Sequence, residues 1–236
     1  MSYSTFNKEN LDTILKELAK EYRRLGGKQQ PAEIILVGGA AVLEGYKFRD
    51  VTSDIDAMIY AASTMKEAAR RVEDKFDLPS DWINDCFRRT GSYSNTIREI
   101  SKLYKTFYGV LDVSVVTGEY LVAMKIRSGR KYKNDLSDIV GILYEQQDRG
   151  QEISFEAIDK AMNKLYGGWD GVDNETMLMV QSLLDNNSHE ITYSKTREQE
   201  KEAKRMLVEF EYKYPNEVNM DNVNAVLEAL RNKKKQ

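Results

Sequence analysis

Two short stretches decide the fold of this 236-residue chain. Residues 33–41 read Glu-Ile-Ile-Leu-Val-Gly-Gly-Ala-Ala, and residues 49–56 read Arg-Asp-Val-Thr-Ser-Asp-Ile-Asp. The first is an apolar, β-branched run that stops at two glycines, which predicts a buried strand and a tight turn. The second ends in two acids at the start of another predicted strand, residues 54–60, and residues 40–45 between them favour a short helix. The order is therefore strand, glycine pair, helix, loop and strand.

Three acids in this pattern predict a metal site. Asp54 and Asp56 flank Ile55, and because side chains alternate along a strand, both carboxylates project from the same face. Two such acids repel each other unless a cation lies between them, and Mg²⁺ or Mn²⁺ with oxygen ligands resolves this. Asp112 is the single acid in a predicted strand at residues 107–116, and it supplies a third carboxylate if that strand is adjacent. We expect the three acids to be both metal ligands and catalytic residues, because such sites hold two metals about 3.5 to 4 Å apart.

The glycine pair, Gly38 and Gly39, adds a place for phosphate. Without a Cβ, backbone N–H groups at a helix start can approach a triphosphate closely, at the positive end of the helix dipole. Each feature alone is also typical of ordinary structure: a turn, two solvated acids, or a surface-facing strand residue such as Asp112. Their conjunction in this order predicts binding of a nucleoside triphosphate through a divalent metal.

The remaining periodicity predicts an α+β fold with a helical end. Residues 10–22 and 66–76 favour amphipathic helices, and residues 98–103 favour a further turn of helix. Helices are also expected at residues 120–127 and 135–146. After Gly150 only helices are predicted, at residues 155–166, 175–184, 197–212 and 220–231. We therefore expect a catalytic domain at residues 1–150 and a helical region at residues 151–236.

Composition excludes several classes of protein. A single cysteine, Cys86, rules out an internal disulfide and a multi-cysteine zinc site. The apolar runs are far shorter than the roughly 18 residues of a membrane span, and the first residues lack a secretory pattern, so a cytoplasmic protein is expected. The net charge of −3 gives no general attraction for nucleic acid. A nucleic-acid partner would need a local basic cluster, such as Arg127, Arg130, Lys131 and Lys133.

The two opening stretches resemble a known signature. Residues 37–41 with residues 49–56 are similar to the AbiEii-like branch of the polymerase-β nucleotidyltransferase superfamily, in which Arg-x-x-Thr-x-Asp-x-Asp follows a glycine pair. A downstream segment, with Lys125, Arg130 and the Asp-x-x-Asp at residues 135–138, resembles a second motif of that branch. The resemblance covers roughly residues 30 to 145. It implies a polymerase-β-type nucleotidyltransferase fold, with a small mixed sheet and flanking helices.

The resemblance also implies roles for individual residues. Asp54 and Asp56 would bind the metal, and Asp112 would complete the metal site or act as the base. The residues implied in nucleotide binding are Gly38, Gly39, Arg49, Thr52, Lys125 and Arg130. Arg49 and Thr52 have the alternative role of bracing the Asp-x-Asp loop, which we prefer for Thr52. Asp135 and Asp138 belong to the motif or simply stabilise a helix start as first-turn acids.

The predicted function is transfer of a nucleoside monophosphate from a nucleoside triphosphate to a hydroxyl acceptor. The acceptor is RNA, such as a tRNA end, or a protein. Relatives in the AbiEii-like branch include toxins of type IV toxin–antitoxin and abortive-infection systems, which implies a phage-defence role and a cognate antitoxin as partner. The alternative hypothesis is a non-catalytic protein of the same fold that binds nucleotide or an antitoxin partner.

Overall fold

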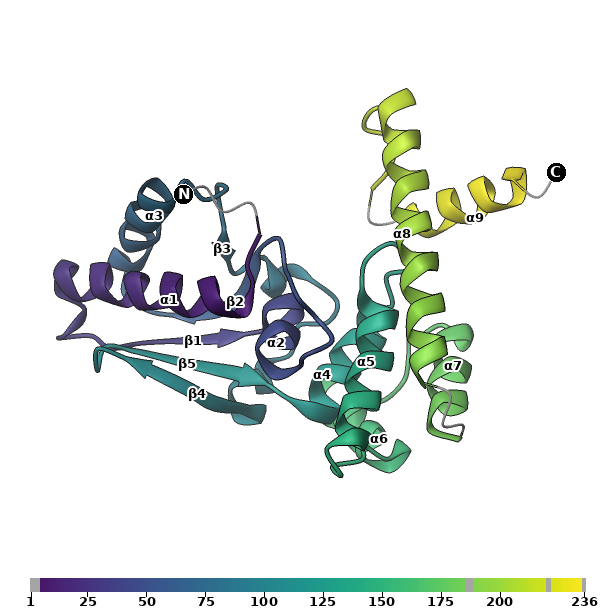
Figure 1. The fold of residues 1–236 in the computed structure, drawn as a ribbon, viewed down its shortest axis with the longest axis horizontal. Coiled ribbons are helices and arrows are strands. Elements are labelled where there is room, and N and C mark those ends of the chain that lie inside the picture. The colour runs from purple at the N-terminus through teal and green to yellow at the C-terminus, as the bar shows by residue number, and fades with distance from the viewer. Residues whose placement is uncertain (1–4, 186–188, 220–221, 235–236) are drawn as a thin grey trace.

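The computed structural model describes residues 5–185, 189–219 and 222–234. Figure 1 shows a sheet with its helices on one side and a group of helices on the other, which confirms the predicted α+β class. Among the described residues, no helix combines the length and the apolar character that a membrane span requires.

A mixed sheet forms the first part of the molecule. In the described residues it has five strands in the order β3-β2-β1-β5-β4. The central strand β1 pairs antiparallel with β2 and parallel with β5, while β4 pairs antiparallel with β5. Apolar β1 lies in the middle because both of its faces are covered. The strands are β1 (Ala32–Leu36), β2 (Ile55–Tyr60), β3 (Ile83–Asn84), β4 (Ser101–Phe107) and β5 (Leu111–Val116).

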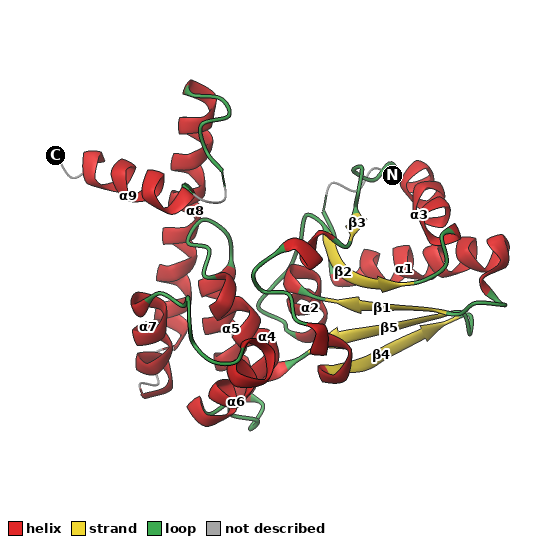
Figure 2. Ribbon diagram, turned by 180° about the vertical axis from the view of Figure 1, so that it is seen from behind, coloured by secondary structure: helices red, strands yellow, loops and turns green. Residues whose placement is uncertain are grey.

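Three helices accompany the sheet. The first, α1 (Lys8–Tyr22), starts at a capping box in which the side chains of Asn7 and Asn10 each accept a hydrogen bond from the other residue's backbone. It packs with α3 (Thr64–Phe76) along one face of the sheet, as Figures 1 and 2 show. The short α2 (Gly38–Gly45) begins immediately after β1, as the glycine pair predicts.

The helical part begins before residue 150. Its α4 packs against α5 and α6, and α5 packs against the long α8, whose last turns extend beyond the neighbouring helices in Figure 1. One hydrophobic core runs from the sheet through α7, and a second small cluster joins α8 to α9. The division at residue 150 stays a prediction. The helices are α4 (Gly118–Ser128), α5 (Asp135–Asp148), α6 (Phe155–Tyr166), α7 (Asn174–Asp185), α8 (His189–Lys213) and α9 (Val223–Lys234).

Two local predictions were wrong around β4. Residues 98–103 were expected to be helical, but a 3₁₀ turn ends at Ile100 and β4 begins at Ser101. As an edge strand with mostly exposed side chains, β4 lacks the apolar alternation by which strands are recognised. The expected strand at residues 107–116 starts later than predicted, because Phe107 ends β4 and β5 begins only at Leu111. Three residues connect β4 to β5, and the first two of them, Tyr108 and Gly109, have the positive φ values that a tight hairpin turn requires.

Candidate functional site

The glycine pair brings the loop of residues 49–56 against the start of α2. Gly38 has φ of +54°, and a Cβ there would lie 3.3 Å from the Oδ2 atom of Asp56. At Gly39 a Cβ would lie 2.6 Å from the Thr52 hydroxyl oxygen and 3.0 Å from a guanidinium nitrogen of Arg49. Close approach therefore requires glycine at these two positions, and the structure places five of the predicted site residues together.

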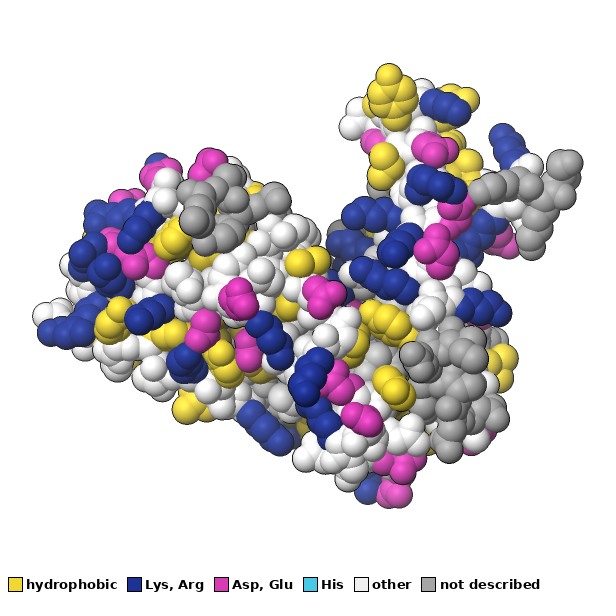
Figure 3. All heavy atoms as spheres, viewed as in Figure 1, with side chains coloured by type: hydrophobic (Ala, Val, Ile, Leu, Met, Phe, Trp, Pro, Cys, Tyr) yellow, Lys and Arg dark blue, Asp and Glu magenta, His cyan; other side chains and the backbone are white. Residues whose placement is uncertain are grey.

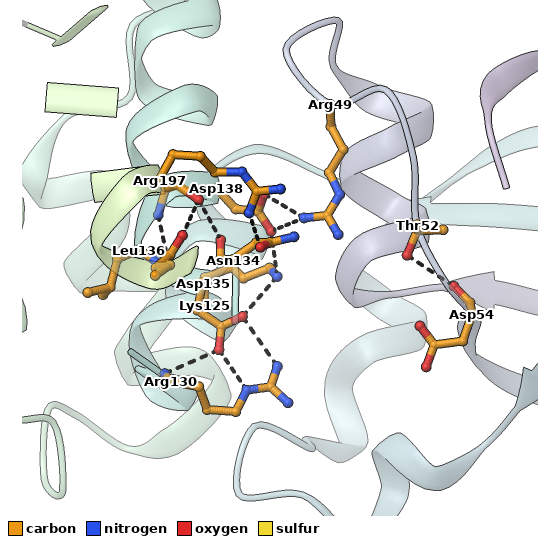
Figure 4. A network of polar contacts seen from close by, with 12 residues as sticks. Arg49, Thr52, Asp54, Lys125, Arg130, Asn134, Asp135, Leu136, Asp138 and Arg197 are labelled. Carbon is orange, nitrogen blue, oxygen red and sulfur yellow. Dashed lines mark hydrogen bonds and ion pairs between the residues drawn. The ribbon is translucent and has the colours of Figure 1, made fainter. Parts of the chain in front are cut away.

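Thr52 braces the loop that carries the two acids. Its side chain is buried, and its hydroxyl donates a hydrogen bond to the backbone oxygen of Asp54 at 3.2 Å. Its backbone exchanges hydrogen bonds with Phe6, at 2.7 and 2.9 Å. These contacts fix the loop and agree with the bracing role. Figure 4 shows Thr52 and Asp54 on the side of the sheet.

Asp54 and Asp56 lie at the start of β2 and form an acidic pair with little compensation. Asp54 is exposed and Asp56 is half-buried. Burial and the neighbouring charge of Asp54 raise the pKa of Asp56, against the opposing influence of Lys133, Arg130 and Lys125. A divalent cation relieves such repulsion. Two carboxylates fit Mg²⁺, because this ion is commonly held by one or two carboxylates together with substrate phosphates and water.

The prediction that Asp112 joins this pair was wrong. In the sheet register Asp112 is level with Glu33, and Glu33 is level with Tyr60. Asp56 is four residues from Tyr60 along β2, which separates the two acids by about 13 Å along the strands at roughly 3.3 Å per residue. The Asp112 carboxylate is exposed and accepts a hydrogen bond from the Thr106 hydroxyl at 2.6 Å.

The position on β5 nearest to Asp56 is apolar. Leu36 is level with both Ala57 and Val115, so one further residue places Val116 level with Asp56. Val116 is fully buried. In the described part of the chain, no cluster of three His, Cys, Asp or Glu side chains could hold a metal ion. A site at this place therefore depends on two carboxylates from the protein.

Across from the acids, three cations are held by two buried carboxylates. The two carboxylate oxygens of Asp138 accept from one guanidinium nitrogen of Arg49, at 2.7 and 2.8 Å, and Asp138 also pairs with the Lys125 ammonium at 2.7 Å. Asp135 accepts from Lys125 at 3.0 Å and from Arg130 Nε at 2.7 Å. We call these five residues the ion-pair network. Figure 4 shows Lys125 and Arg130 on the side of the helices, opposite Asp54, while Arg49 reaches across to Asp138 from the loop on the side of the sheet.

The charged groups of this network are buried and held by one another. Asp135 is fully buried, and Asp138 and Lys125 are 2% and 6% exposed. Burial alone would lower the pKa of Lys125, but Asp138 and Asp135 outweigh it and raise that pKa above its ordinary value. Burial would likewise raise the pKa of Asp135, but Lys125 and Arg130 hold it well below its usual range. Lys125 was predicted to contact phosphate, but its ammonium pairs with both carboxylates instead. The network contains three cations and two anions, so its net charge is positive by one.

Sequence reasoning missed a contribution from α8. The Glu200 carboxylate accepts hydrogen bonds from the backbone N–H groups of Leu136 and Ser137, at 2.8 and 3.2 Å, at the start of α5. Burial raises the pKa of Glu200 to about 7, although the bonds from Ser137 act in the opposite direction. Nearby, the Arg197 guanidinium donates to the side-chain oxygen of Asn134. The sequence held one signal, because Glu200 has a helical spacing with Thr196, Ala203 and Leu207, and these four residues form the buried stripe of α8.

The loop before the acids is also tied to α5. The ring of Phe48 lies against Gly141, where a Cβ would be 2.6 Å from a ring carbon. The backbone N–H of Lys47 donates to the Glu145 carboxylate at 2.7 Å. Together with the Arg49–Asp138 pair, these contacts join the loop of the sheet to the helical part. The two sides of the site are therefore mechanically connected.

Comparison with protein families identifies the chain. A family model described as "Nucleotidyltransferase of unknown function (DUF6036)" matches residues 13–214, which include the glycine pair, both acids and the whole ion-pair network. Comparisons with curated proteins and with solved structures give no match. The five-stranded mixed sheet with flanking helices is consistent with a nucleotidyltransferase fold. The chain therefore belongs to this nucleotidyltransferase family.

Proposed function

We propose that this protein is a Mg²⁺-dependent enzyme that transfers a nucleoside monophosphate from a nucleoside triphosphate to a hydroxyl acceptor. Membership of a nucleotidyltransferase family supports the reaction class. The observation that carries the proposal is the undercompensated pair of Asp54 and Asp56 beside a glycine-lined helix start. Asp112, which lies toward the other end of the sheet, has no part in it.

On the acidic side, Asp54 and Asp56 would hold the ion. When bound, Mg²⁺ supplies neutralisation of phosphate charge and orientation of the phosphates for in-line displacement. Gly38 and Gly39 open the start of α2, where backbone N–H groups and the helix dipole favour an anion. These four residues would therefore bind one side of the triphosphate.

On the basic side, Arg130 and Lys133 would contact the phosphates. Both exert a favourable electrostatic influence on Asp56, and Lys133 is exposed. Lys125 and Arg49, paired with buried carboxylates, would act mainly by fixing this side. The acceptor hydroxyl gives its proton to solvent and its oxygen bonds to the α-phosphorus, while the bond from the α-phosphorus to the oxygen that bridges to the β-phosphorus breaks and pyrophosphate leaves. Positioning and charge stabilisation supply most of the catalysis in such transfers.

The acceptor is proposed to be RNA, such as a tRNA end, or a protein side chain. Figure 3 shows Lys and Arg side chains over the middle of α8 and beside it toward the sheet, a local positive surface suited to a polyanion. The AbiEii-like resemblance adds the hypothesis of a toxin in a phage-defence system with a cognate antitoxin. That narrower family placement stays a prediction.

Labelled nucleoside triphosphates, incubated with Mg²⁺ and cellular RNA or protein, test the proposal. Wild type should label one of these fractions, and Asp56→Ala should lose at least about a thousandfold in rate, because a metal ligand contributes several kcal/mol to the transition state. The matched control is Asp112→Ala, an acid on the same sheet, which should label as wild type does. Equal labelling by Asp56→Ala would refute the proposal. Tight triphosphate binding without transfer to any acceptor would support the non-catalytic alternative.

A further inference from the structure

Glu200 is a buried carboxylate that α8 places at the start of another helix. It is 2% exposed and lies on the stripe of α8 that packs inward, with Thr196, Ala203 and Leu207. Helix starts leave N–H groups without partners inside the helix, and a side-chain acceptor satisfies them. Glu200 does this for α5 from 63 residues away along the chain, because it accepts from the N–H of Ser137.

The turn that Glu200 caps is the turn that carries both acids of the ion-pair network. Leu136 and Ser137, whose N–H groups Glu200 binds, lie between Asp135 and Asp138. The Ser137 hydroxyl also donates to Glu200. The directions of the Asp135 and Asp138 carboxylates therefore depend on a turn whose backbone is held from α8.

Those two carboxylates in turn set the positions of the cations. Arg49 and Lys125 bind Asp138, and Lys125 and Arg130 bind Asp135. A shift of the first turn of α5 would move these partners relative to Asp56. A cavity of about 1190 Å³ lies next to this turn, and Glu200 and Leu136 line it together with side chains of α7 and α8. The first turn of α5 is therefore not packed against protein on every side.

We propose that Glu200 is a positioning residue, which fixes the first turn of α5 and through it the cations opposite Asp54 and Asp56. This inference rests on the proposed function, because that function assigns Arg130, which Asp135 holds, to triphosphate binding. Without the carboxylate the turn samples other arrangements. Only the fraction of molecules with the cations in place then binds triphosphate well, so the apparent Kd rises.

Substitutions at Glu200 separate positioning from charge. Glu200→Ala should raise the Kd and KM for the Mg²⁺-bound triphosphate about fivefold, the change in an equilibrium constant that corresponds to a lost helix cap. Glu200→Gln should restore most of the affinity, because its amide oxygen can accept from the same N–H groups. The matched control is Glu198→Ala, an exposed glutamate on the same helix, which should bind as wild type does.

Calorimetric titration with ATP, GTP, CTP and UTP, each with Mg²⁺, tests this, with thermal melting to verify folding. If wild type binds none of them, the proposed function fails. If wild type binds and Glu200→Ala binds equally well, the positioning role is wrong while the proposed function stands. If Glu200→Ala does not fold, Ser137→Ala decides. It should weaken binding about twofold, and unchanged binding would overturn the inference.

Discussion

The two sides of the site hold charge in opposite ways. On the sheet, Asp54 is exposed, and the pKa of half-buried Asp56 is raised by burial and by its acidic neighbour. On the helices, the charges of Lys125, Asp135 and Asp138 are buried and paired at 2.7 to 3.0 Å. Among the described residues, the carboxylates on the sheet side lack a close cationic partner within the site, whereas the charged groups on the helical side are already paired with one another.

This difference indicates a division of labour. Desolvation of ions is costly, so a buried ion-pair network is weak evidence for stability. It does, however, fix the orientation of each charged side chain before substrate binds. Groups that are fixed before substrate arrives need no reorganisation during the reaction. The acidic pair instead remains under repulsion until a cation binds. The comparison predicts that removing a charge has opposite consequences for folding on the two sides.

The largest expected effect on stability is at Asp138. Asp138→Ala should lower the free energy of unfolding by about 3 to 5 kcal/mol, because it leaves Lys125 and Arg49 without a carboxylate that now binds both. Asp56→Asn should leave stability unchanged or raise it, since it removes repulsion with Asp54. Urea denaturation of both variants measures this. Similar losses in the two variants would erase the distinction between the sides.

A smaller effect is expected where the loop meets α2. Gly39→Ala should destabilise by about 1 to 3 kcal/mol, because its Cβ would press on Thr52 and Arg49. Gly45→Ala, in the same helix, meets no atom within 4 Å and should stabilise by about 0.4 to 1 kcal/mol. Thermal or urea unfolding gives both values. A neutral Gly39→Ala would show that the loop is not tightly packed on the glycine pair.

The pH dependence of folding should also separate two buried carboxyls. The pKa of Glu200 rises from 4.5 to about 7 on folding, so the folded state binds more protons and stability falls as pH increases across that window. Asp135 has a lowered pKa, so its contribution is present at neutral pH and is lost as pH falls below about 3.8.

Comparison of wild type with Glu200→Gln checks the first of these effects. The variant should lack the decrease in unfolding free energy between pH 4.5 and 7, a difference on the order of 3 kcal/mol for a pKa raised from 4.5 to about 7. Urea denaturation at half-unit pH steps measures it. Parallel curves for the two proteins would contradict the assignment to Glu200.

The acidic side of the site was predictable from local sequence, whereas the position of Asp112 was not. The apolar run, the glycines and the alternation of Asp54 and Asp56 are local signals, and they gave β1, α2 and β2 correctly. The place of Asp112 depends on strand register, which the hairpin turn at Tyr108 sets. Because β5 runs parallel to β1, its early residues lie away from the glycine pair.

The basic side was only partly predictable. Lys125, Arg130 and the Asp-x-x-Asp were recognised as a motif, but their mutual pairing and burial depend on how α4 and α5 pack. Glu200 is remote in sequence and lies in a helix rich in charges, where glutamates are usually solvated. Its spacing with Thr196, Ala203 and Leu207 was the one local sign that it faces inward.

The most direct measurement is calorimetric titration of wild type, Asp56→Asn and Asp112→Asn with nucleoside triphosphate, with Mg²⁺ and with excess chelator. We expect wild type and Asp112→Asn to bind a triphosphate only when Mg²⁺ is present, and Asp56→Asn to lose that binding while remaining folded. Binding of equal strength without Mg²⁺, or unchanged binding by Asp56→Asn, would contradict a site built on the two carboxylates of β2.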